Sequence, residues 1–206
     1  MSIQLNPPQR EAVHYLDGPL LVLAGAGSGK TRVITEKIAY LIRACGLSPA
    51  TIAAITFTNK AAREMRERVE KLLGSRPDGL TISTFHALGM RILREEARAL
   101  GYKPNFSVFD AADALGIVSD LAGSADKATI RRLQTQISQW KNALVSPDAA
   151  RSLARDEHAT LAAHAYASYV ATLKAYQAVD FDDLIALPVM LFETFPKTLE
   201  KWQHRL

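Results

Sequence analysis

Apolar positions in the first half of the chain follow two different spacings. Three short apolar runs, LLVLAG (20–25), TIAAITF (51–57) and LTISTF (80–85), have the length and composition of buried strands. Between them, residues 31–46 and 59–74 repeat apolar side chains every three or four positions, and each segment ends in a glycine that can cap a helix. Strand, helix, strand, helix, strand with short connections predicts right-handed crossovers and a parallel sheet.

After Phe85 the strand pattern fades and helical patterns follow one another. Residues 86–101 are predicted to form a helix, residues 105–110 a brief extended piece, and residues 158–178 an Ala-rich bundle helix. Another helix is expected to begin after Ser146, because a serine followed by a proline suits the first positions of a helix. The fold class is therefore expected to change directly after the third strand.

The composition is that of an ordinary globular chain of 206 residues, with 48% hydrophobic and 22% charged residues. No apolar run approaches the roughly 18 residues that cross a bilayer. The N-terminus also lacks the basic-then-apolar order of a signal peptide. Cys45 is the single cysteine, which excludes an internal disulfide and a cysteine-based metal site. We therefore expect a cytoplasmic protein.

The net charge of +4 is unevenly distributed along the chain. Residues 1–103 hold 15 lysines and arginines against 9 acidic residues, whereas residues 104–206 hold 10 against 12. An anionic partner is therefore expected to meet the first half, although a mild basic excess is also common on a solvated surface.

The eight residues AGAGSGKT (24–31) stand between the first apolar run and the first expected helix. Backbone N–H groups at such a turn point into one concavity at the positive end of the helix, and glycine lets a phosphate come close. Lys30 adds a mobile positive charge, and the Thr31 hydroxyl can ligate Mg²⁺. The strict pattern G-x-x-x-x-G-K-[ST] has glycine where this chain has Ala24, and a looser form admits alanine. The segment predicts a phosphate-binding loop (P-loop), with a chance glycine-rich turn as the alternative.

Four further segments occur in order along the chain: LNPPQREAV (5–13), ITFTNKAAREMRERV (55–69), TISTFHALG (81–89) and VDFDDLI (179–185). Together with AGAGSGKTRVIT, they closely resemble the Rep/UvrD/PcrA branch of superfamily 1 DNA helicases over the whole length of the chain. The resemblance implies an α/β fold, a P-loop RecA-like parallel sheet that is incomplete here, with an inserted all-α subdomain. The implied domains are the N-terminal part of the RecA-like domain at 1–86, the helical subdomain at 87–195, and a return toward the RecA-like domain at 196–206.

The resemblance also implies ATP and Mg²⁺ as cofactors. The family reads adenine with the glutamine of its first segment, here Gln9, whose amide offers a donor and an acceptor. It places the arginine after the loop, here Arg32, against the base, where a guanidinium can stack. A surface glutamine and a solvated helix arginine are the alternatives. Lys30 and Thr31 are the implied catalytic residues, and Thr31 the implied metal ligand. The implied nucleotide-binding residues are Gln9, Ala24, Gly25, Ala26, Gly27, Ser28, Gly29, Lys30, Thr31 and Arg32.

Two segments resemble the single-stranded DNA motifs of the family. Each lies at the carboxyl end of an expected strand, the edge at which open α/β sheets bind ligands. Hydroxyls and helix-start N–H groups can hold a phosphate there, and an aromatic ring can meet a base. A place in the core is the alternative for Phe57, and a packing or hydrogen-bonding role is the alternative for His86. The implied DNA-binding residues are Thr56, Phe57, Thr58, Asn59, Lys60, Thr84, Phe85 and His86.

Two charged segments are interpreted as structural. The basic residues of segment 63–71 are interleaved with glutamates and indicate a solvated helix face. Asp180, Asp182 and Asp183 are interpreted as acids at a helix N-terminus that complement the helix dipole, with a metal cluster as the alternative.

The acidic motif D-E-x-Q-D, which in this family completes the Mg²⁺ site and positions the attacking water, does not occur in the 206 residues. A second, arginine-bearing RecA-like domain is also missing. We therefore expect the N-terminal part of a 3′–5′ helicase that acts on single-stranded DNA and single-strand/double-strand junctions. The chain alone is expected to bind ATP without efficient hydrolysis and to self-associate through unpaired sheet edges. A non-helicase P-loop NTPase and a DNA-binding module without ATP chemistry are the alternatives.

Overall fold

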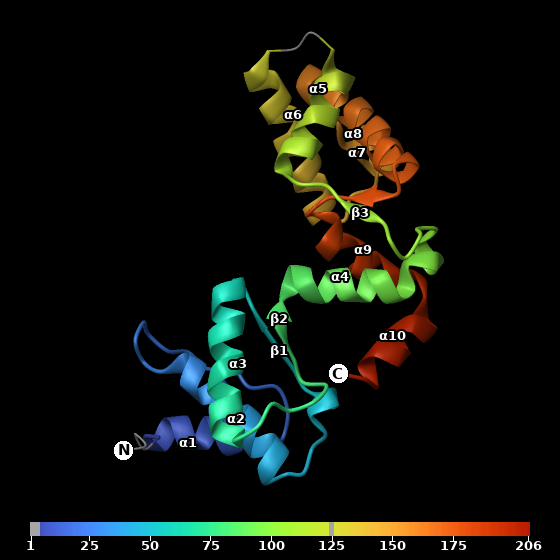
Figure 1. Cartoon of the computed structure of the whole chain (residues 1–206). Helices are drawn as coiled ribbons and strands as arrows, with labels where there is room; N and C mark the ends of the chain where they lie inside the picture. The colour runs from blue at the N-terminus through green and yellow to red at the C-terminus, as the bar shows by residue number, and fades with distance from the viewer. Residues whose placement is uncertain (1–4, 124–125) are drawn as a thin grey trace. The chain divides into compact units, whose positions relative to one another are not determined.

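The computed structural model describes residues 5–123 and 126–206, which divide into two compact units. The first unit comprises the chain up to Phe85 together with Glu200–Leu206, and the second comprises His86–Leu199. The sequence analysis places these boundaries after residues 86 and 195. Figure 1 labels the elements of both units, which are described separately below.

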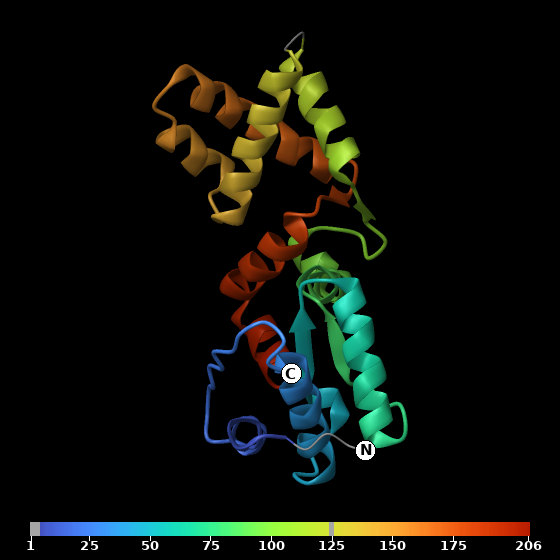
Figure 2. The ribbon, with the colours of Figure 1, turned by 90° about the vertical axis from the view of Figure 1, so that its left-hand side faces the viewer.

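The first unit combines helices with a short parallel sheet. Its strands β1 and β2 pair in parallel, in a register that runs from Ala53 opposite Thr81 to Thr56 opposite Thr84. Figure 2 shows the two strands side by side with the helix α3 along them. The elements are α1 (Pro7–His14), α2 (Lys30–Arg43), the 3₁₀ helix η1 (Pro49–Thr51), β1 (Ala53–Thr56), α3 (Asn59–Leu73) and β2 (Thr81–Thr84).

The second and third predicted strands and the two predicted helices of this unit are confirmed. Their apolar faces meet in one core, because the helical stripe of α2 and α3 packs on the apolar residues of β1 and β2. Gly74 ends α3 in the left-handed conformation, which glycine adopts without a steric penalty. The buried residues of this core are Ile38, Ile52, Ala54, Ala62, Met65, Val69 and Ile82.

The first predicted strand is wrong. Residues 20–25 have no regular secondary structure, and the side chains of Leu21 and Leu23 are 80% and 87% exposed. A strand of a parallel sheet is stable only where a neighbouring strand forms hydrogen bonds with its backbone N–H and C=O groups. Within the described residues, β1 and β2 pair with each other and with no third strand. The apolar run therefore has no pairing partner, and apolar composition alone does not make a strand.

The second unit is mainly helical, as the sequence predicts. Its two short strands, β3 and β4, pair in parallel and bring residues 107–108 beside residues 178–179. The extended piece predicted at 105–110 is thereby confirmed, while β4 begins at the last residue of the segment 158–178, which the sequence predicts to be helical. The elements are α4 (Phe85–Glu96), η2 (Ala97–Leu100), β3 (Ser107–Val108), α5 (Ala111–Ala122), α6 (Lys127–Asn142), α7 (Pro147–Leu153), α8 (Glu157–Ala175), β4 (Ala178–Val179), α9 (Asp183–Thr194) and α10 (Pro196–Gln203). The first residue of α4 and the residues of α10 from Glu200 onward belong to the first unit.

The core of the second unit lies between α5, α6, α7 and α8. Leu133, Ile137 and Trp140 of α6 face Tyr166 and Tyr169 of α8. The Ser146 hydroxyl accepts a hydrogen bond from the backbone N–H of Ala149, which confirms the predicted helix start. No helix in the described residues is both long and apolar enough to cross a membrane.

Candidate functional site

The glycine-rich loop leads directly into the first turn of α2. Gly27 and Gly29 have φ angles of 74° and 87°, in the left-handed region that favours glycine. Gly29 is the residue before the helix, and a Cβ there would lie 3.0 Å from Nε2 of Gln9. A side chain at this position would therefore meet both backbone strain and a tight contact. The backbone N–H groups of the first turn remain available to an anion at the positive end of the helix dipole.

The Lys30 side chain folds back over the loop. Its Nζ donates hydrogen bonds to the carbonyl oxygens of Ala24 at 3.0 Å and Gly25 at 2.7 Å. The Ser28 hydroxyl also donates to the Gly25 carbonyl, at 2.7 Å. Lys30 is exposed, so its ammonium can exchange these neutral acceptors for a stronger anionic one without unfolding the loop. The loop thus carries an exposed cation at the position where the sequence analysis expects phosphates.

Gln9 links the beginning of α1 to the same loop. Its Oε1 accepts a hydrogen bond from the backbone N–H of Asn6 at 3.1 Å, which forms a capping box at the start of α1. Its Nε2 donates to the carbonyl oxygen of Ser28 at 3.0 Å. The structure therefore places Gln9 beside the loop. Both groups of its amide contact backbone, so reading a base would require them to exchange partners.

Thr31 and Arg32 lie in the first turn of α2 and are half-buried. The Arg32 guanidinium lies 3.8 Å from the Glu36 carboxylate, one turn further along the helix. At 3.8 Å, this half-buried i,i+4 ion pair is weak enough to open for a ligand. The Thr31 hydroxyl can ligate Mg²⁺, while the exposed Lys30 ammonium and the N–H groups at the start of α2 can bind the phosphates of a nucleoside triphosphate.

The carboxyl ends of β1 and β2 present two aromatic rings. Thr56 and Thr84 end the two strands opposite each other, and each is followed by a phenylalanine. The rings of Phe57 and Phe85 lie 5.9 Å apart in a tilted arrangement. Phe57 is 88% exposed, so it is not a core residue of this chain.

The segment after Phe57 forms the start of α3. The Thr58 hydroxyl caps the helix by accepting from the Ala61 N–H at 3.1 Å. Asn59 and Lys60 follow in the first turn, and both are exposed. Thr84 differs from these residues, because its side chain is buried at the end of β2.

His86 begins the second unit and is exposed. Its ring lies 5.7 Å from the ring of Phe181, which precedes α9 and is 54% exposed. The sequence analysis did not identify Phe181. The available signal was a large aromatic residue placed between acidic residues, a position that disfavours burial.

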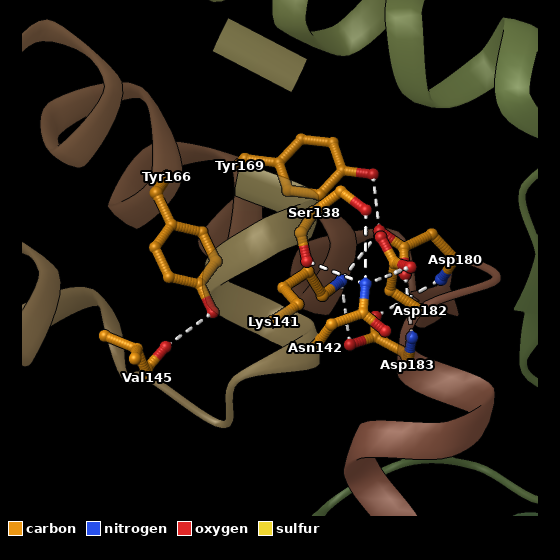
Figure 3. A network of polar contacts seen from close by, with 9 residues as sticks. All are labelled: Ser138, Lys141, Asn142, Val145, Tyr166, Tyr169, Asp180, Asp182 and Asp183. Atoms are coloured by element: carbon orange, nitrogen blue, oxygen red, sulfur yellow. Dashed lines mark hydrogen bonds and ion pairs between the residues drawn. The ribbon is translucent and has the colours of Figure 1, made fainter. Parts of the chain in front are cut away.

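A polar network in the second unit was also missed (Figure 3). Lys141 of α6 lies between Asp180 and Asp183, with its Nζ 2.7 Å from Oδ2 of Asp180 and 2.8 Å from Oδ1 of Asp183. The hydroxyl of Tyr169 donates to Oδ2 of Asp180 at 2.8 Å. All three charged groups are buried.

Asp183 lies in the first turn of α9, as the sequence analysis predicts for an acid that complements the dipole. In the described residues no three His, Cys, Asp or Glu side chains form a group that could hold a metal. Burial, together with the nearby negative charge of Asp180, raises the pKa of Asp183 to about 6 although Lys141 opposes the shift. Burial also disfavours ionised Asp180, but the Lys141 ammonium and the surrounding hydrogen bonds hold the pKa of Asp180 below its ordinary value.

A glycine-rich loop that opens a helix beside a short parallel sheet defines a candidate nucleotide-binding protein of the α/β class. The chain belongs to the UvrD/REP helicase N-terminal domain family, whose model matches residues 5–206. It is 50% identical over 208 residues to the ATP-dependent DNA helicase Rep of Escherichia coli K12, covering 99% of this chain and 31% of that protein. It is 43% identical over 205 residues to the ATP-dependent DNA helicase PcrA of Staphylococcus aureus Mu50, covering 98% of this chain and 28% of that protein. The chain thus spans about a third of the length of these relatives.

Proposed function

We propose that the chain is the nucleotide-binding and single-stranded-DNA-binding part of an ATP-dependent DNA helicase. The observation that carries this proposal is the pairing of two features in the first unit. A glycine-rich loop with an exposed lysine leads into α2, and two exposed aromatic rings stand at the carboxyl ends of β1 and β2. The resemblance supports 3′–5′ movement on DNA and binding at single-strand/double-strand junctions by the whole protein.

ATP with Mg²⁺ is the proposed cofactor. Lys30 would leave the carbonyls of Ala24 and Gly25 and bind the terminal phosphates, while the backbone of Gly25 to Gly29 surrounds them. Thr31 would hold the Mg²⁺ through its hydroxyl. Gln9 and Arg32 would contact the adenine base, since both lie next to the loop and make only exchangeable contacts.

Single-stranded DNA is the proposed partner at the strand ends. Stacking on aromatic rings suits single strands, because every base has a π-face. The register places Thr56 opposite Thr84, so the rings of Phe57 and Phe85 lie at the same edge. Asn59 and Lys60 can hold a backbone phosphate at the positive end of α3.

The 206 residues are proposed to bind ATP without turning it over at a helicase rate. They contain no D-E-x-Q-D acid to position water, and losing such a positioned base costs about 10²–10⁴-fold in rate. The measurement is phosphate release with and without single-stranded DNA. A DNA-stimulated activity that disappears in Lys30→Ala would contradict this part of the proposal.

The DNA assignment is tested by fluorescence anisotropy with a labelled oligothymidylate. Phe57→Ala should weaken binding by about 1–3 kcal/mol, the value of one base stacked on an aromatic ring. Tyr176→Ala is the matched control, because Tyr176 is also an exposed aromatic residue in a tilted pair, with Phe109. The control should bind like the parent. Binding of ATP without any binding of oligothymidylate would favour a P-loop NTPase of another kind, and the reverse result would favour a DNA-binding module.

A further inference from the structure

A buried lysine in the second unit holds two carboxylates of a single turn. Lys141, in the last turn of α6, is 4% exposed, and it contacts Asp180 and Asp183, which lie 39 and 42 positions further along the chain. Figure 3 shows its ammonium between the two carboxylates. Burying an ion pair is often no more stabilising than an apolar replacement of the same volume. Unlike apolar packing, this arrangement holds each of the two acids in a defined position.

The turn from Asp180 to Asp183 is locked at both ends. The backbone N–H of Asp183 donates to Oδ1 of Asp180 at 2.9 Å, and the N–H of Asp180 donates to Oδ2 of Asp183 at 3.2 Å. With Lys141 and Tyr169, all four carboxylate oxygens therefore have partners. On the outer side, Nδ2 of Asn142 donates to Oδ1 of Asp182 at 2.9 Å. Four contacts thus tie the turn to α6 and α8: two from Lys141, one from Asn142 and one from Tyr169.

This turn determines where Phe181 points. Both neighbours of Phe181 face the locked network, and its own side chain is 54% exposed beside the ring of His86. The ring of Phe181 is therefore accessible to a ligand, and it stands beside a second exposed ring, that of His86. An aromatic ring that is held in place loses little conformational entropy when a base stacks on it.

We propose that Lys141 is a positioning residue for single-stranded DNA, because it keeps Phe181 beside His86, where the two rings contact a base. This inference rests on the proposed function, since His86 belongs to one of the two DNA segments. Lys141 acts through the turn and does not touch the DNA, because its ammonium is enclosed by Asp180, Asp183 and the ring of Tyr169.

The test is a double-mutant cycle on the affinity for labelled oligothymidylate. Phe181→Ala should weaken binding by about 5- to 150-fold, the equivalent of one stacked base. Lys141→Met should weaken it by at least about fivefold, and the double variant should match Phe181→Ala within about twofold, because both changes remove the same contact. Lys127→Met is the matched control: it removes an equal charge from the exposed start of the same helix and should bind like the parent within about twofold.

The second readout needs no DNA. The ring current of Phe181 acts on the His86 imidazole, so the ¹H–¹³C signals of His86 should move in Lys141→Met in the direction that they take in Phe181→Ala. Tyr169→Phe keeps the ring and removes one hydrogen bond to Asp180, so it should shift the same signals less. It serves as the milder variant if Lys141→Met does not fold.

Three results would overturn the inference. The first is a folded Lys141→Met chain with parental His86 signals and parental DNA affinity. The second is a further loss of affinity when Lys141→Met is added to Phe181→Ala. The third is an unfolded Lys141→Met chain together with a Tyr169→Phe chain whose His86 signals are parental. A parent chain that does not bind oligothymidylate would overturn the proposed function, and the DNA role of Lys141 with it.

Discussion

Replacing Lys30 by methionine should weaken ATP binding and leave the fold intact. Methionine keeps an unbranched side chain of similar length but removes the ammonium. The ammonium contacts only two loop carbonyls, those of Ala24 and Gly25, and it is exposed. Water can hydrogen-bond to these carbonyls in the variant, so the free energy of unfolding should change by less than about 0.5 kcal/mol.

The effect on ATP affinity follows from an exchange of partners. A hydrogen bond to a charged group contributes about 1.5–3 kcal/mol, whereas one between neutral groups contributes about 0.5–1.5 kcal/mol. Lys30 gives up two carbonyl contacts when it binds a phosphate, so its net contribution to the free energy of ATP binding should lie in the lower half of about 1.5–3 kcal/mol. A loss of about 1.5–2 kcal/mol corresponds to roughly 10- to 30-fold weaker binding.

Calorimetric titration with Mg·ATP measures this loss, and Lys37→Met is its matched control. Lys37 lies on the same helix, and its ammonium also donates to two backbone carbonyls, those of Ala12 and Tyr15. That variant should lose stability, since these carbonyls close the end of α1, and should keep its ATP affinity within about twofold. Equal ATP affinity for Lys30→Met and the parent, or an equal loss in Lys37→Met, would refute the phosphate role of Lys30.

Three further predictions concern the stability and association of the chain. A Cβ at Gly89 would lie 1.8 Å from the carbonyl oxygen of Leu184, so Gly89→Ala should cost at least about 1–3 kcal/mol in urea unfolding; parental stability would contradict this packing. The pKa of Asp183 is raised in the folded chain, so protonated Asp183 stabilises the fold below its ordinary pKa of 3.8, and this stabilisation is lost as the pH rises to about 6. Asp183→Asn should therefore flatten the decline in the free energy of unfolding between these pH values, and an unchanged dependence of that free energy on pH would contradict the prediction. Replacing the exposed Leu21 and Leu23 by serine should reduce self-association in sedimentation velocity; an unchanged sedimentation profile would contradict a role for this apolar run.

The spacing of apolar residues predicted those helices and strands that are stabilised by their own sequence and by elements close to them in the chain. The stripe of apolar residues at helical spacing predicted α2 and α3, and the apolar runs before Phe57 and Phe85 predicted the two strands that pair. The same reasoning failed at residues 20–25. Their apolar run is as strong as the other two, but a strand also needs a partner for its backbone, and the described residues offer none.

The sequence by itself determined the glycine-rich loop, the helix that it opens and the aromatic residue after each paired strand, because each depends on residues that are adjacent in the chain. Only the tertiary structure decided that Phe57 is exposed and paired with Phe85. It alone showed that Lys141 joins two acids about forty residues away, which the sequence analysis had assigned to the helix dipole. A buried charge needs its partner within hydrogen-bond distance, and folding brings the two together whatever their separation in the chain.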